Sequence, residues 1–191
     1  SYLQSLQKDH VKLVDRAVKA ITKDGIIDAE NNNYNFDVII YATGFNPFNI
    51  LSSMEVKGAG GVTLADCWQD NIQSHKTVAV SGFPNFFMLL GPNSALGHNS
   101  VILMIEAQVN YIVKCLKKMR KNGWTSLDPK SVSQDKFNNF IQKRLQGTVW
   151  QGSCSSWYKD DDEQNFTIWP LSATRYMLSM RKPDFSEYNV K

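Results

Sequence analysis

Cysteine pairs and long hydrophobic runs are missing from this chain of 191 residues. Its three cysteines, Cys67, Cys115 and Cys154, form no C-x-x-C pair, so we interpret them as free thiols rather than as a disulfide scaffold. No apolar run reaches the ~18 residues that a membrane span needs, and the N-terminus lacks a signal-peptide pattern. We therefore expect no membrane span and a reducing, cytoplasmic compartment.

A strong charge of either sign is also missing. The 21 basic and 18 acidic residues leave a net charge of +3 without a long basic run, which gives no electrostatic reason to expect nucleic acid as a partner. The solvated face of a helix is predicted for a basic cluster of Lys114, Lys117, Lys118, Arg120 and Lys121. No metal site is predicted, because His10, His75 and His98 are widely separated.

The first part of the chain reads as a small β-meander. Short strands are predicted over residues 11–14, 18–21 and 26–27. The apolar run from Val38 to Ala42 is typical of a buried strand in a parallel sheet covered on both faces. It ends at Thr43 and Gly44, where a small turn would let the backbone approach a ligand.

A second strand and two helices are predicted further along the chain. Apolar residues over 78–90 indicate another buried strand, which runs into the loop Gly91-Pro92-Asn93-Ser94. A helix capped near Asn99 or Ser100 and stopped by Gly123 should follow. Its inward face is predicted to consist of Ile102, Ile105, Val109, Ile112, Leu116 and Met119. A second helix should be capped near Ser133, with Phe137, Phe140, Ile141 and Leu145 inward.

The entrance to the first of these helices is a candidate ligand site. Its N-terminus follows Gly91 and Gly97, and unpaired backbone N–H groups at such a terminus favour an anion or a carbonyl oxygen. His98 stands beside it as a loop-ordering residue, a ligand neighbour or a proton relay. The ordinary alternative is a strand joined to a core helix.

Three segments in order carry a resemblance to a known family. The first is Ala42-Thr43-Gly44, and the second runs from Phe83 through Gly91-Pro92-Asn93-Ser94 to Gly97-His98-Asn99-Ser100. The third is the tryptophan-rich tail from Val149-Trp150 to Asn165 and Trp169-Pro170. Together they resemble the C-terminal portion of class B flavin-dependent monooxygenases, the class of Baeyer-Villiger and flavin-containing monooxygenases.

The resemblance implies an α/β fold. The chain would be the C-terminal part of a flavoprotein with two Rossmann-like domains, for FAD and NAD(P), together with a small β-meander and a helical layer. Residues 1–45 would end the NADP-binding domain, 46–77 would form a linker, and 78–191 would close the FAD-binding domain. No Gly-x-Gly-x-x-Gly turn is present, so we expect the missing N-terminal half of the same enzyme to supply both phosphate-binding turns.

The resemblance also implies the chemistry. NADPH would reduce FAD, O2 would be captured as a flavin peroxide, and one oxygen atom would pass to a small organic substrate by Baeyer-Villiger or heteroatom oxidation. No catalytic residue is identified, and this piece alone should be inactive. The nicotinamide would contact Trp150. The flavin side would be formed by Thr43, Gly44, Gly91, Pro92, Asn93, Ser94, Gly97, His98, Asn99 and Ser100.

Two other functions stay open from the sequence. A pyridine-nucleotide flavoprotein reductase would share the strand and turn elements, but it normally carries a redox-active cysteine pair, which is not visible here. A non-enzymatic binding module would be favoured if the natural chain began at Ser1, because half of a redox site cannot do redox chemistry.

Overall fold

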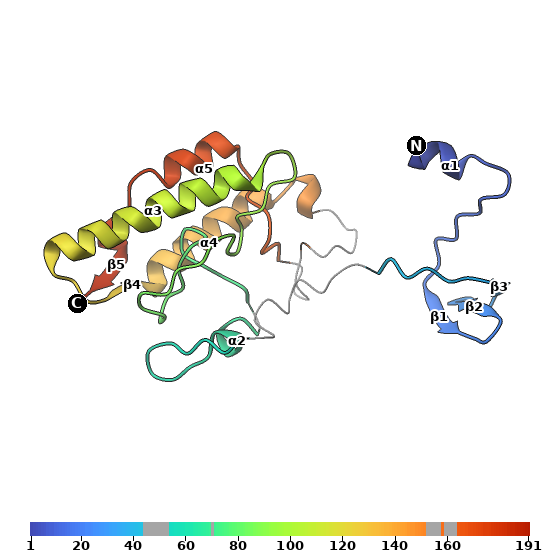
Figure 1. The fold of residues 1–191 in the computed structure, drawn as a ribbon, viewed down its shortest axis with the longest axis horizontal. Coiled ribbons are helices and arrows are strands. Elements are labelled where there is room, and N and C mark those ends of the chain that lie inside the picture. The colour runs from blue at the N-terminus through green and yellow to red at the C-terminus, as the bar shows by residue number, and fades with distance from the viewer. Residues whose placement is uncertain (44–53, 70, 152–157, 159–163) are drawn as a thin grey trace. The chain divides into compact units, whose positions relative to one another are not determined.

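The chain forms two compact units, residues 1–45 and 46–191 (Figure 1). The computed structural model describes residues 1–43, 54–69, 71–151, 158 and 164–191. Gly44 and Cys154 therefore lie outside the described residues. Each unit is described by itself below.

The first unit contains the predicted meander. A short helix α1 (Tyr2–Leu6) precedes strands β1 (Val18–Ile21), β2 (Gly25–Asp28) and β3 (Asn33–Asn35), which pair antiparallel in that order. The strands predicted over 18–21 and 26–27 are confirmed. Asp28 is buried, and its carboxylate organises the β2–β3 connection by accepting hydrogen bonds from the backbone and side-chain amides of Asn32 at 2.9 Å.

Two strands predicted in this unit are wrong. Residues 11–14 form no strand, and neither do residues 38–42, where Val38 is 74% and Ile40 is 86% exposed. A buried strand of a parallel sheet needs a neighbour on each side for its N–H and C=O groups. Within the described residues no strand pairs with this run, and the sheet of this unit is a three-stranded antiparallel meander.

The second unit is helical, with one small sheet. Strands β4 and β5 pair antiparallel, with Leu127 opposite Val190. The buried apolar side chains of this unit come from positions between Leu64 and Tyr188. Its elements are α2 (Leu64–Cys67), α3 (Val101–Asn122), β4 (Leu127–Pro129), α4 (Ser131–Leu145), the 3₁₀ turn η1 (Val149–Gln151), α5 (Ala173–Ser179), the 3₁₀ turn η2 (Phe185–Glu187) and β5 (Tyr188–Val190).

Helix α3 begins and ends as predicted. The Ser100 hydroxyl accepts a hydrogen bond from the backbone N–H of Ile102 at 3.3 Å, and Gly123 closes the helix in the left-handed region at φ 69°. Its predicted inward face is largely wrong, since Ile102 is 57% and Leu116 is 50% exposed. The buried face consists of Met104, Gln108, Tyr111, Cys115 and Met119.

The strand predicted over residues 78–90 is also wrong, although part of the run is buried. Val78, Ala79 and Val80 are in the core, whereas Leu89 and Leu90 are nearly half exposed. The segment is a series of turns rather than a strand. Positive φ angles at Asn85 and Leu90 break the extended backbone within this run, and Lys76, Thr77 and Asn93 have positive φ angles on either side of it.

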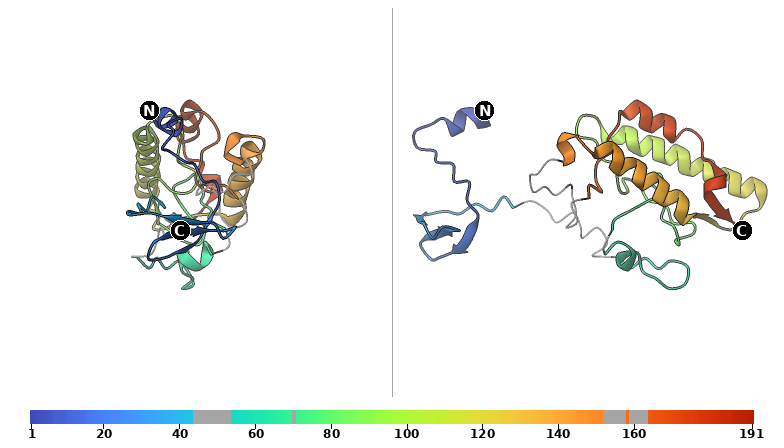
Figure 2. Two further views of the ribbon diagram at one scale, coloured as in Figure 1. Left: turned by 90° about the vertical axis from the view of Figure 1, so that its right-hand side faces the viewer. Right: turned by 180° about the vertical axis from the view of Figure 1, so that it is seen from behind.

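Helices α3 and α4 flank this irregular segment and satisfy its backbone (Figures 1 and 2). From α3, Gln108 accepts a hydrogen bond from the Leu90 N–H at 2.9 Å. From α4, Gln134 accepts one from Ser81 N–H at 2.8 Å, and the Asn138 amide donates to Ser74 O at 2.9 Å. Two helices and their amide side chains thus replace a sheet as the support of the segment.

Helix α4 differs from its prediction at its start and on one face. It begins at Ser131, and its N-cap is Lys130, three residues before the predicted cap at Ser133. Ile141 and Leu145 are buried as expected, but Phe140 is 41% exposed because the inward position is taken by Asn138, which binds Ser74. A polar side chain with a buried backbone partner therefore displaces an aromatic one from the core side.

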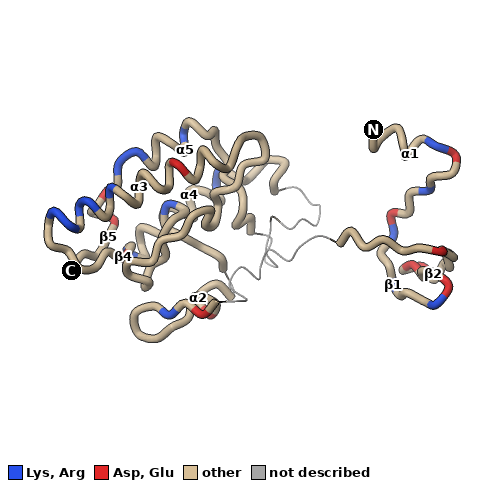
Figure 3. Tube along the Cα trace, viewed as in Figure 1, with Lys and Arg blue, Asp and Glu red and all other residues tan. Residues whose placement is uncertain are grey.

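Basic residues gather along the second half of α3 (Figure 3). Lys114, Lys117, Arg120 and Lys121 are exposed there, which confirms the predicted solvated face for these four. Lys118 differs, because it is only partly exposed and its Nζ lies 5.9 Å from the centroid of the Trp124 ring. Cys67 and Cys115 are free thiols, exposed and buried respectively. In the described part of the chain, no helix has the length and apolarity of a membrane span.

Candidate functional site

The loop from Gly91 to Ser100 leads into α3 and has two different halves. Residues 91–94 are buried, while residues 97–100 are exposed. Gly91 packs so closely against the carbonyl oxygen of Thr77 and the side chain of Met88 that an added Cβ would collide with both. The Ser94 hydroxyl donates to Gly91 O at 2.6 Å. The first half is therefore built into the protein, and the second half is accessible.

Asn93 fixes the buried half of the loop. Its backbone is left-handed at φ 58°, a region that Asn tolerates better than most residues. Its N–H donates to Phe166 O at 2.6 Å, and its side-chain amide donates to Asn165 O at 2.8 Å and Ile168 O at 3.2 Å. The predicted ligand residues Asn93 and Ser94 thus spend their side-chain donors on the protein backbone.

A segment from the tail lies alongside the loop. Ala95 and Ile168 form a parallel bridge, in which Ala95 N–H donates to Thr167 O at 3.0 Å and Trp169 N–H donates to Ala95 O at 2.8 Å. Two regions more than 70 positions apart are therefore joined by backbone hydrogen bonds. Sequence order alone does not predict this pairing.

Trp150 and Gly97 are brought together by this arrangement. A Cβ built on Gly97 would collide with the Cη2 and Cζ2 atoms of Trp150, so the indole ring lies directly against the glycine. The ring also makes an edge contact with Tyr158, with centroids 5.3 Å apart. Gly97 was predicted on the flavin side and Trp150 on the nicotinamide side, and in this structure the two residues touch.

The entrance of α3 supplies the electrostatics of the exposed half. His98, Asn99 and Ser100 are exposed there, and the Asn99 side chain accepts from Ser100 N–H at 2.8 Å. The first turn of α3 contains no acidic residue. The positive end of a 22-residue helix is therefore not neutralised by a carboxylate of that turn.

A buried hydrogen-bond network lies next to the loop and is joined to it by Gln108, which accepts from the N–H of Leu90 just before the loop. Gln108 donates to the Thr77 hydroxyl at 3.0 Å, and that hydroxyl pairs with the Tyr176 hydroxyl from α5. Burial raises the pKa of Tyr176 to about 12, so its phenol stays neutral. Gln108 and Tyr176 were not predicted from the sequence. The buried face of α3 repeats every three or four residues, at Met104, Gln108, Tyr111, Cys115 and Met119. A search for this spacing that accepts polar as well as apolar residues would have found it.

The remaining predicted residues fall in different places. Thr43 is exposed in the first unit, and Gly44 lies outside the described residues. Cys115 has a pKa raised to about 12 by burial, which makes it an inert core thiol. The described residues contain no group of three or more His, Cys, Asp or Glu side chains placed to hold a metal ion.

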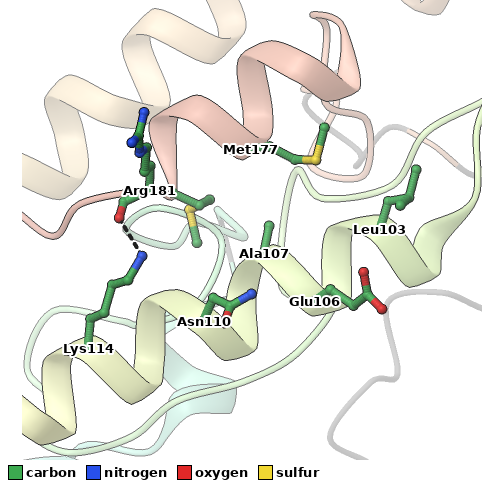
Figure 4. A pocket seen from close by; sticks show the side chains of 8 residues that line it. Leu103, Glu106, Ala107, Asn110, Lys114, Met177 and Arg181 are labelled. Carbon is green, nitrogen blue, oxygen red and sulfur yellow. Dashed lines mark hydrogen bonds between the residues drawn. The ribbon is translucent and has the colours of Figure 1, made fainter.

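A shallow pocket between α3 and α5 lies apart from this loop (Figure 4). Its volume is about 220 Å³, below the ~300 Å³ at which small-molecule sites usually begin. Lys114 donates to Arg181 O at 2.7 Å at one end of it. None of the predicted site residues lines this pocket, so the loop at the entrance of α3 with Trp150 remains the candidate site.

Comparisons with known proteins agree with the predicted resemblance. No family model matches the chain. Baeyer-Villiger monooxygenases of Streptomyces coelicolor and Pseudomonas aeruginosa are each 34% identical to it over 192 residues, which cover 100% of this chain and 37% and 36% of those proteins. The chain thus spans little more than a third of the length of these relatives. The resemblance to this class is confirmed.

Solved structures share the fold. The structure of OTEMO in complex with FAD and NADP superposes with a TM-score of 0.80 at 23% identity, over 100% of this chain and 37% of that one. An open structure of cyclohexanone monooxygenase gives a TM-score of 0.72 at 20% identity, over 100% of this chain and 35% of that one. The mixed α and β fold is confirmed at this level.

Proposed function

Because the whole chain resembles about a third of a Baeyer-Villiger monooxygenase, we propose that it is the C-terminal portion of an FAD- and NADPH-dependent monooxygenase. The intact enzyme would insert one oxygen atom from O2 into a small organic substrate, by Baeyer-Villiger or heteroatom oxidation. The main support for this proposal is the 34% identity over the full chain to two such enzymes.

The residues at the entrance of α3 fit a flavin edge. Residues 97–100 are exposed backbone and small polar side chains at the positive end of a helix whose first turn has no acidic residue. Such an end stabilises the electron-rich N1 and C2=O region of a flavin. The Trp150 indole beside Gly97 supplies a flat apolar surface for a nicotinamide.

In the proposed mechanism, bound FAD supplies the redox and oxygen chemistry, and the protein positions the reactants. The N-terminus of α3 holds negative charge at the flavin edge. Gly97, His98, Asn99 and Ser100 present this terminus, while Gly91, Pro92, Asn93 and Ser94 shape the loop behind it. Trp150 would orient the nicotinamide with its ring, which lies against Gly97. The flavin-side roles of Thr43 and Gly44 stay a prediction from the resemblance.

The test is oxygen transfer by the full-length enzyme. With NADPH and ¹⁸O2 present, we expect one heavy oxygen atom in the product of a cyclic ketone, a tertiary amine or a thioether, measured by mass spectrometry. NADPH consumption with no labelled product from any of the three would contradict the proposal.

The 191-residue chain gives a second test. It has no Gly-x-Gly-x-x-Gly turn to hold a pyrophosphate, so we expect it to lose FAD on desalting and to oxidise no substrate. The flavin absorption that stays with the protein is the measurement. Retention of one FAD per chain would show that the pyrophosphate-binding turns are not needed.

A further inference from the structure

Asn165 uses every polar atom of its side chain although it is completely buried. Its Oδ1 accepts from Ile168 N–H at 2.9 Å and Thr167 N–H at 3.2 Å, which closes a local turn in the tail. Its Nδ2 donates to the carbonyl oxygen of Trp150 at 3.1 Å. One end of the amide therefore shapes the tail, and the other end holds Trp150.

The backbone of the same residue is joined to two further elements. The carbonyl oxygen of Asn165 accepts from the Asn93 side chain at 2.8 Å and from Gln142 of α4 at 3.0 Å. Asn165 thus connects the loop before α3, helix α4 and the turn η1 that carries Trp150. A buried amide with all its partners in place is costly to disturb, because each broken bond leaves a polar atom without water.

The indole of Trp150 is located from two sides. Its backbone is held by Asn165, and its ring lies against Gly97, where no side chain intervenes. The turn η1 is only three residues long, and Val149 beside Trp150 is 88% exposed. Within the turn Gln151 N–H donates to Thr148 O at 3.1 Å, and Trp150 packs in part against the core. The bond from Asn165 is an additional anchor that ties the Trp150 backbone to the tail.

We propose that Asn165 is a positioning residue that sets the Trp150 ring against Gly97 and thereby joins the nicotinamide side of the site to the flavin side. The assignment of these two sides rests on the proposed function. The position of the ring is a separate property, and it can be measured without turnover.

The test compares Asn165→Ser with Gln142→Met in the full-length enzyme. The serine hydroxyl can still accept from the following backbone amides but is too short to reach Trp150 O. Gln142→Met removes another hydrogen bond to the same residue and leaves the bond to Trp150 intact. It is therefore the matched control for a general loss of stability.

The readouts are the ¹⁹F resonance of 5-fluorotryptophan at position 150, assigned by its disappearance in Trp150→Phe, and the Kd of NADP⁺. Asn165→Ser should move the resonance toward its solvent-exposed position and weaken NADP⁺ binding about threefold to tenfold, the range for one lost hydrogen bond. FAD content should stay unchanged. Gln142→Met should leave the resonance and the Kd as in the parent.

An unmoved resonance in Asn165→Ser, or an equal movement in Gln142→Met, would overturn the proposal. Gly97→Ala pushes the ring from the opposite side and should move the same resonance, which shows that the resonance reports the position of the ring. Asn165→Asp replaces the donor to Trp150 O by an acceptor and should also move the resonance, which provides the decision if Asn165→Ser does not fold. If Trp150→Phe leaves the Kd of NADP⁺ unchanged, the nicotinamide role fails, while the resonance still decides whether Asn165 positions the ring.

Discussion

Single residues in the loop before α3 show how a predicted site residue can act indirectly. Asn93 and Ser94 were predicted to face the flavin from their resemblance to a family motif. Their side chains instead bind backbone carbonyls of Asn165, Ile168 and Gly91. The sequence predicted the loop as a site, but it could not say which side chains bind the protein itself, because the partners of the Asn93 side chain lie more than 70 positions away.

Asn93→Ala should destabilise the 191-residue chain by about 2–4 kcal/mol. It removes two buried hydrogen bonds and places alanine in the left-handed region. Urea unfolding followed by far-UV circular dichroism measures the loss. Asn93→Gly keeps the backbone accessible and should cost less; an equal or greater loss would mean that the backbone conformation contributes nothing.

Glu187 should make the stability of the second unit depend on pH. Its neighbour His75, whose Nε2 lies 3.3 Å from the carboxylate, is the main cause that holds the pKa of Glu187 below its ordinary value of 4.5. The folded state therefore binds fewer protons than the unfolded state in the acid range, and stability falls as the pH falls through the lowered pKa.

Glu187→Gln tests this dependence. The difference in unfolding free energy between the parent chain and the variant should be largest near neutral pH and should shrink between about pH 5.5 and pH 3. Urea titrations at several pH values give the comparison. A difference that grows on acidification would show that the sign is wrong.

Helix α3 shows what hydrophobic period can and cannot predict. Its bounds followed from a cap and a glycine, which are local features and were predicted well. Its buried face did not follow, because Gln108 and Tyr111 are inward through hydrogen bonds to Thr77 and Tyr188. A pattern that counts only apolar residues assigns such positions to solvent.

Two alanine substitutions distinguish the two faces of α3. Met104→Ala should cost about 2–5 kcal/mol, because Met104 is fully buried, whereas Ile102→Ala should change stability by less than about 0.5 kcal/mol. Thermal and urea unfolding of the 191-residue chain measure both. A larger loss for Ile102→Ala would restore the face predicted from the sequence.

At the scale of the whole molecule, the two units have very different cores. All the buried apolar side chains of the described residues lie between Leu64 and Tyr188, in the second unit. Among residues 1–43 of the first unit, only Gly25 and Asp28 are buried. In the second unit the two long helices α3 and α4 were predicted, but β4, β5 and α5 were not, because they are short and the pairing of β4 with β5 is non-local.

Removal of residues 1–45 should leave the melting temperature of the second unit within about 2 °C of that of the 191-residue chain, since no core side chain is lost. Differential scanning calorimetry of the two chains makes the comparison. A drop of about 5 °C or more would mean that the first unit stabilises the second.

An apolar stripe on the surface of α3 also affects how strongly copies of this chain associate in solution. Val109, Val113 and Leu116 project from one side of the helix at 41%, 38% and 50% exposure, and Ile102 extends the stripe at 57%. Such a surface favours contacts between copies of the chain. Self-association should therefore increase with protein concentration, and added salt should not reverse it, because the contact is apolar. Charged replacements along this stripe would be the first choice for keeping concentrated solutions clear.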